Sequence, residues 1–190
     1  RQAYAAGIRD FAENRLQEAL EKQEQLQDLS DICWHFIGHL QTNKIQKVLH
    51  NFHWIHSVDS LKLAQRLDCL GENVTTLPQL CLQVKPLSDP SKYGWHINEL
   101  WQDLPQLEQL KHLNIRGLMT ILPLGLSEEE VSQAFSIIKD LQTKINHESS
   151  LSLTELSMGM SEDYGRAINA GSTMIRLGRI LFGERCVLQA

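Results

Sequence analysis

The chain has 190 residues, 42% of them hydrophobic, and a formal net charge of −5 at pH 7. This length can bury one sizeable core, so we expect a single domain over residues 1–190. The lysines and arginines are scattered along the chain, which argues against nucleic acid as the main partner. No apolar run approaches the roughly 18 residues of a membrane span, and the first residues lack the apolar core of a signal peptide. We therefore expect a cytoplasmic protein that does not bind membranes.

Helical and strand patterns alternate along the chain, which is typical of repeated βα units around a parallel sheet. The predicted strands cover residues 8–12, 34–38, 54–58, 79–84, 115–121, 153–157 and 174–177. The predicted helices cover residues 1–6, 14–29, 42–50, 60–71, 96–104, 105–110, 127–146 and 162–170, and a helical turn follows the last strand. Asp59 or Ser60 can cap one helix, and Ser127 with Glu130 forms a capping box for the long one.

The helix before the first predicted strand bears on the fold class. Eight strands close a βα barrel, and the sequence provides seven strands with a helix in front. We therefore expect a TIM-type (β/α)8 barrel that lacks its first β-strand in this chain. An open doubly wound sheet remains an alternative on periodicity alone, although its usual glycine-rich turn after the first strand is absent.

Two loops near the C-terminus have the composition of a phosphate site. Ser161 follows one predicted strand with small neighbours, and Gly178 and Arg179 follow the last one. In βα barrels the loops after the seventh and eighth strands often bind phosphate, because backbone N–H groups point toward it there. The alternative is that the glycines only turn the chain.

Arg176 and Asn14 are the other candidate site residues. Arg176 alternates with Ile175, so it should face the barrel interior, where a charged group needs a partner. The alternative for Arg176 is a structural ion pair, for example with Glu13. Asn14 lies between a strand and a helix, and its alternative role is to cap that helix.

Neither a metal site nor a nucleophile is indicated. His35 and His39, or His50, His53 and His56, do not combine with a carboxylate or cysteine into a convincing ligand set. The four cysteines are widely separated and form no C-x-x-C pair, so we expect reduced, mostly buried thiols.

Several segments together resemble the YggS/PROSC-like family of pyridoxal phosphate homeostasis proteins. The resemblance rests on residues 11–18, 34–44, 56–60, 92–94, 116–121 and 156–185, and the last of these segments is long and specific. It implies an α/β barrel like the N-terminal domain of alanine racemase, with pyridoxal 5'-phosphate at the strand ends.

The resemblance also implies residue roles. Arg176 should approach the pyridine nitrogen of the cofactor and Asn14 should lie nearby. Ser161, Thr173 and the backbone of Gly178 and Arg179 should hold the phosphate. The family's Schiff-base lysine belongs to a Val-Ser-Lys segment on the first strand, and that segment does not occur in this sequence.

Two positions depart from the family pattern. Ala12 replaces a glycine at a tight strand end, which could shift Asn14 slightly. Lys85 follows a strand where the family commonly has a neutral polar residue. A solvated loop lysine is the favoured interpretation of Lys85, and the Schiff base is not assigned to it.

The resemblance favours a protein of intracellular vitamin B6 balance that binds pyridoxal phosphate without robust catalysis. Its partners would be the cofactor and pyridoxal-phosphate-dependent apoenzymes, and we expect a monomer. A fold-type III amino-acid racemase-like enzyme is the main alternative. A phosphate-binding barrel enzyme that does not use pyridoxal phosphate is a third.

Overall fold

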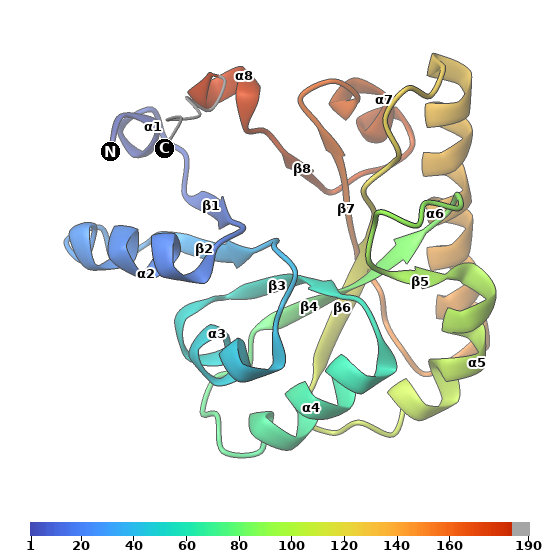
Figure 1. Ribbon diagram of the computed structural model, residues 1–190, viewed down its shortest axis with the longest axis horizontal. Helices are drawn as coiled ribbons and strands as arrows, with labels where there is room; N and C mark the ends of the chain where they lie inside the picture. The colour runs from blue at the N-terminus through green and yellow to red at the C-terminus, as the bar shows by residue number, and fades with distance from the viewer. Residues whose placement is uncertain (184–190) are drawn as a thin grey trace.

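The computed structural model describes residues 1–183, which form a curved parallel sheet with helices around it (Figure 1). Seven strands pair in the order β1-β2-β3-β4-β6-β7-β8, and a two-residue strand, β5, pairs with β4. Their bounds are Asp10–Glu13 (β1), Cys33–Phe36 (β2), Trp54–Val58 (β3), Gln79–Lys85 (β4), Trp95–His96 (β5), Asn114–Met119 (β6), Glu155–Met160 (β7) and Met174–Arg176 (β8). All seven predicted strands are confirmed, and β5 was not predicted.

The helices also follow the predicted order. Their bounds are Gln2–Ala5 (α1), Leu16–Gln25 (α2), Ile45–Asn51 (α3), Leu61–Gly71 (α4), Ile97–Leu107 (α5), Glu128–Glu148 (α6), Tyr164–Asn169 (α7) and Arg179–Phe182 (α8), with a 3-10 turn at Thr42–Lys44. The predicted break before Pro105 is wrong, because α5 continues through it. The capping box between Ser127 and Glu130 is confirmed, as is the Ser60 cap of α4.

The parallel pairings produce the expected barrel architecture. Every strand pairing in residues 1–183 is parallel, so each connection returns across the outside of the sheet, where the helices lie (Figure 1). In the described residues the sheet is open between β8 and β1, its two ends. The carboxyl ends of all strands therefore lie along one rim.

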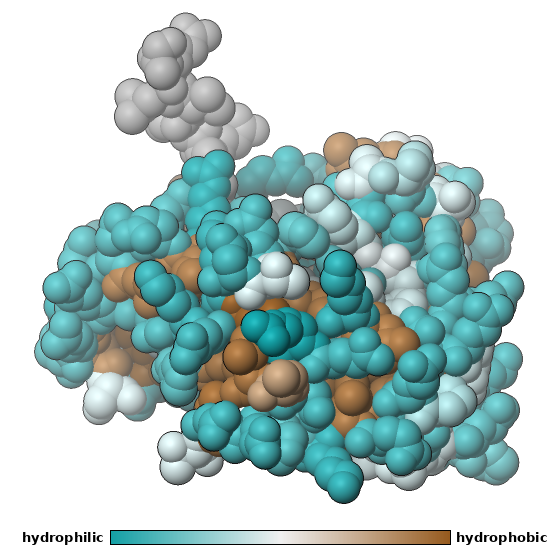
Figure 2. Space-filling model, turned by 60° about the horizontal axis from the view of Figure 1, so that its bottom comes forward, coloured by the Kyte–Doolittle hydropathy of each residue, from teal (hydrophilic) through white to brown (hydrophobic). Residues whose placement is uncertain are grey.

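The hydrophobic core has two parts, one on each face of the sheet. The larger cluster fills the space between the strands and the helices and includes Phe36, Ile55 and Leu118. The smaller cluster consists of Trp54, Cys81 and Met119, which alternate with helix-facing residues and lie inside the barrel. Figure 2 shows one face of the molecule, on which hydrophilic side chains predominate and hydrophobic ones are visible near the middle.

The sequence predicted no membrane span and reduced, mostly buried cysteines. None of the helices in residues 1–183 is long and apolar enough to cross a membrane. Cys33, Cys69 and Cys81 are free, Cys81 is buried and Cys69 is exposed, while Cys186 lies outside the described residues.

Gly38 fixes how the chain passes over the carboxyl end of β2. A Cβ atom at this position would lie 2.0 Å from the backbone oxygen of Asn14, so only glycine fits without a backbone shift. We expect Gly38→Ala to lower the free energy of unfolding by about 1–3 kcal/mol, as overpacking commonly does. Urea denaturation measures this change.

Gly165→Ala is the matched control, because a Cβ on Gly165 meets no atom within 4 Å and the residue lies inside α7. Its stability should stay within about 1 kcal/mol of the parent, toward greater stability, since alanine is the better helix former. Equal stability of the two variants would contradict the close approach at Gly38.

Candidate functional site

The rim formed by the carboxyl ends of the strands brings together most of the residues that the sequence singled out. Asn14 follows β1, Ser161 follows β7, and Gly178 and Arg179 follow β8. Arg176 is the last residue of β8. In a βα barrel this rim is where ligands bind, so these five residues define the candidate site.

Asn14 lies over the end of β2, where its backbone contacts the position of Gly38. The capping alternative for Asn14 is wrong, because α2 begins at Leu16 and its N-cap residue is Arg15. The side chain of Glu13 points elsewhere and forms an ion pair with Lys22, whose Nζ lies 2.5 Å from Glu13 Oε1. The course of the backbone after β1 therefore places Asn14 at the rim.

A hydrogen bond and an ion pair join the loop after β7 to the loop after β8. The backbone N–H of Ile180 donates to Ser161 Oγ at 3.4 Å, and Arg179 Nη2 lies 2.7 Å from Glu162 Oε1. A Cβ on Gly178 would meet nothing within 4 Å, so the backbone there is open to approach. Ser161, Gly178 and Arg179 thus form one group with a hydroxyl and exposed backbone N–H groups.

Thr173 does not join this group. It precedes β8, so it lies at the amino end of the strand, opposite the rim. Its hydroxyl accepts a hydrogen bond from the backbone N–H of Leu156 at 2.8 Å, and its own N–H donates to the Leu156 carbonyl. The structure thus corrects the expected phosphate role of Thr173, which here joins β8 to β7.

Arg176 faces the barrel interior, as its alternation with Ile175 predicted. Nη1 donates to Ser157 Oγ and Nη2 to the Thr120 carbonyl, each at 2.7 Å. The predicted alternative of an ion pair with Glu13 is wrong, and no carboxylate in residues 1–183 forms a salt bridge with Arg176. Burial lowers the pKa of Arg176 to about 10, which leaves it protonated at neutral pH.

Behind Arg176 a row of hydrogen-bonded polar side chains crosses the barrel interior. His56 Nδ1 lies 2.7 Å from Ser157 Oγ, and His56 Nε2 lies 2.9 Å from His35 Nδ1. His35 Nε2 in turn lies 3.0 Å from Asp10 Oδ1. The sequence interpretation missed this row, although one signal was present. His35 and Ser157 each lie between two apolar residues of their strands, and His56 alternates with Ile55.

The two histidines in this row are neutral at neutral pH. Burial lowers the pKa of His35, although Asp10 opposes the shift. Burial lowers the pKa of His56 well below its usual value, and the neighbouring His35 and Arg176 lower it further. Both rings pack near Trp54, and the His35 ring is stacked on it with a centroid distance of 5.9 Å.

Asp10, Cys33 and His35 bring three types of metal ligand within 4.8 Å of one another. The histidine sets considered from the sequence did not include this group. Burial, followed by the charge of Asp10, raises the pKa of the Cys33 thiol to about 11, so the thiol is protonated at neutral pH. Metal binding requires the thiolate, and the His35 nitrogen already pairs with Asp10, so the arrangement favours hydrogen bonding.

Lys85 ends β4, and its Nζ donates to the carbonyl oxygen of Lys92 at 3.3 Å. The contact ties Lys85 to the segment that leads into β5. In the same region the Tyr93 ring stacks on His39 at a centroid distance of 3.7 Å, and His39 Nδ1 lies 3.0 Å from Asp59 Oδ2. Lys85 is thus partly buried, whereas a solvated lysine was expected.

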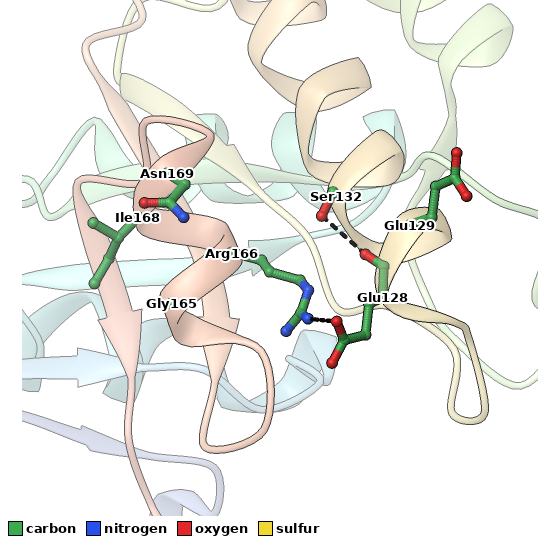
Figure 3. Close-up of a pocket in the computed structure, with 7 residues that line it drawn as sticks. All are labelled: Glu128, Glu129, Ser132, Gly165, Arg166, Ile168 and Asn169. Carbon is green, nitrogen blue, oxygen red and sulfur yellow. Dashed lines mark hydrogen bonds and ion pairs between the residues drawn. The ribbon is translucent and has the colours of Figure 1, made fainter.

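A surface hollow lies on the outside of the barrel, between the first turns of α6 and α7 (Figure 3). Arg166 of α7 reaches across it to an ion pair with Glu128 of α6. Ser132 and Asn169 also line it. Because it lies outside the barrel, it does not contribute to the strand-end site.

Comparisons with known proteins agree with this architecture. Residues 1–186 match the family described as alanine racemase, N-terminal domain. The pyridoxal phosphate homeostasis protein of a Synechocystis species is 61% identical over 183 residues, which cover 96% of this chain and 84% of the relative. The protein of the same name from Pseudomonas aeruginosa is 44% identical, with coverages of 97% and 78%.

Solved structures give the same result. PipY of Synechococcus elongatus, solved with pyridoxal phosphate bound, superimposes with a TM-score of 0.88 at 50% identity. The aligned region covers 96% of this chain and 85% of PipY. Alanine racemase of Clostridium difficile has a TM-score of 0.75 at 17% identity, and this shows the shared fold alone. A TIM-type barrel, the strand-end rim and these relatives together establish that the chain belongs to the alanine racemase N-terminal domain family, among its pyridoxal phosphate homeostasis proteins.

Proposed function

We propose that this protein binds pyridoxal 5'-phosphate at the strand-end rim and serves its intracellular homeostasis without robust catalysis. The observation that carries the proposal is Arg176, a protonated guanidinium at the rim whose hydrogen-bond partners are a hydroxyl and a carbonyl. A cation placed inside a barrel without a carboxylate partner in the described residues is suited to an electron-rich ligand. The relative solved with pyridoxal phosphate bound supports the choice of ligand.

The residues at the rim fit the cofactor. Arg176 would approach the ring nitrogen, and Ser161 with the backbone N–H groups of Gly178 and Arg179 would hold the phosphate. The open space around Gly178 supports this assignment, since a bulky anion needs close access to the backbone. Next to Arg176, the buried hydroxyl of Thr120 has no hydrogen-bond partner within residues 1–183, which adds an unused polar group to the same region.

The chemistry of Arg176 favours binding over catalysis. Bound pyridoxal phosphate supplies an electron-withdrawing ring, and that ring withdraws electrons best when its nitrogen is protonated. A guanidinium stays protonated and can only donate hydrogen bonds, so it disfavours a proton on the nitrogen that faces it. We therefore assign the protein a role in holding the cofactor and releasing it to dependent apoenzymes, as a monomer with one binding domain.

Replacing Arg176 should weaken cofactor binding selectively. We expect Arg176→Gln to raise the dissociation constant for pyridoxal phosphate about 10- to 100-fold, because a charge-assisted hydrogen bond contributes about 1.5–3 kcal/mol. Arg179→Gln is the control, since its side chain pairs with Glu162 and only its backbone is assigned to the phosphate. Absorbance titration measures both variants, and equal effects would contradict the roles assigned here.

The lysines of this chain should not hold the cofactor covalently. Among the described residues, Lys85 is the only lysine that ends a strand, and its Nζ is engaged with the Lys92 carbonyl. We expect a polypeptide of residues 1–190 that is incubated with pyridoxal phosphate and reduced with borohydride to carry no specific lysine adduct by mass spectrometry. An adduct at Lys85 that disappears in Lys85→Arg would refute this expectation.

A further inference from the structure

The row of polar side chains behind Arg176 connects a carboxylate to a guanidinium through three neutral groups. The hydrogen bonds run from Asp10 through His35, His56 and Ser157 to Arg176, with donor–acceptor distances of 3.0, 2.9, 2.7 and 2.7 Å. His35, His56 and Ser157 are buried, whereas 72% of the Asp10 side chain is exposed. The row therefore extends from a solvated end to the candidate cofactor site.

The two ends of the row determine the position of every proton between them. Ionised Asp10 can only accept, so His35 Nε2 carries a proton and donates to it. Because neutral imidazole has one N–H, His35 Nδ1 must then accept from His56 Nε2. His56 Nδ1 is left as an acceptor, so it takes the hydroxyl proton of Ser157.

Arg176 completes this order from the other end. Its guanidinium has donors only, so Ser157 Oγ accepts from Nη1 through an oxygen lone pair. Each group in the row therefore donates toward Asp10, and such aligned hydrogen bonds polarise and strengthen one another. The opposite order is excluded because it would require ionised Asp10 to donate.

We propose that His56 and Ser157 are positioning residues for Arg176, and that the one-directional row ending at Asp10 holds the guanidinium in the orientation that meets the cofactor ring. The proposal rests on the proposed binding of pyridoxal phosphate at Arg176. Ser157 and the Thr120 carbonyl fix the guanidinium at two of its nitrogens, which defines its plane. Without Ser157, the Thr120 contact alone would leave the guanidinium free to turn about that one hydrogen bond.

Histidine tautomers test the order of the row without any cofactor. In protein labelled with nitrogen-15 at histidine, NMR at neutral pH should show His35 and His56 each neutral with the proton on Nε2. In Asp10→Asn the acceptor-only end is lost, because an amide can donate or accept, so His35 and His56 should show a mixture of tautomers. A proton on Nδ1 of either histidine in the parent protein would overturn the proposal.

Removal of the hydroxyl tests the effect on the cofactor. We expect Ser157→Ala to raise the dissociation constant for pyridoxal phosphate about tenfold and to shift the absorbance maximum of the bound cofactor. Ser57→Ala is the matched control, since Ser57 is equally buried but its hydroxyl donates to the Gly38 carbonyl on the other face of the sheet. It should leave both measurements unchanged.

The two tests separate this proposal from the proposed function. If Arg176→Gln weakens binding while Ser157→Ala matches Ser57→Ala, the positioning role is refuted and the binding site stands. If Arg176→Gln has no effect, the binding site itself is refuted, and the tautomer measurement still decides the order of the row. Should Ser157→Ala fail to fold, His56→Phe decides the proposal, because it removes the acceptor of the Ser157 hydroxyl, and an unchanged dissociation constant and absorbance maximum in that variant would refute the positioning role.

Discussion

The parallel pairing of seven strands sets where the helices, the core and the candidate site lie. Parallel strands place all their carboxyl ends along one rim, and their helical connections must cover the outer face. Side-chain alternation then divides each strand between two environments. One set of residues packs under the helices, and the other points into the barrel, where the candidate site and its supporting side chains lie.

The barrel interior combines apolar and polar layers. Trp54, Cys81 and Met119 form an apolar cluster, and the hydrogen-bonded row from Asp10 to Arg176 lies among them. Burial of His35, His56 and Ser157 is tolerated because each has a hydrogen-bond partner, and an unpaired buried polar group would cost about 1–3 kcal/mol. The neutral state of the two histidines follows from the same burial, which lowers both pKa values.

The chain belongs to the alanine racemase N-terminal domain family, and a relative in it has been solved with a cofactor bound. PipY, solved with pyridoxal phosphate bound, is 50% identical to this chain over the aligned residues. In the proposed binding site Arg176 is the residue assigned to the cofactor ring, and its direct partners in the structure are a buried hydroxyl and a backbone carbonyl. Under that proposal, the charged guanidinium only donates hydrogen bonds and so disfavours a proton on the ring nitrogen.

Several features could be predicted from the sequence because they depend on neighbours along the chain. Strand and helix order, the Ser60 and Ser127 caps and the inward direction of Arg176 all follow from local periodicity and capping chemistry. The two-residue strand β5 could not be predicted, since it exists only through its pairing with β4. Thr173 was grouped with the phosphate residues by family resemblance, although it lies at the amino end of its strand.

The barrel class, the strands and the charged residue that points inward follow from local sequence patterns. The side chains that support that residue are defined by the three-dimensional fold. His56 and Ser157 are 101 residues apart in the chain, and they meet because the curved sheet brings the interior faces of β3 and β7 together. Local periodicity predicts that each residue faces inward, but contact across a barrel depends on strand order, register and curvature, which arise only when the whole sheet has formed.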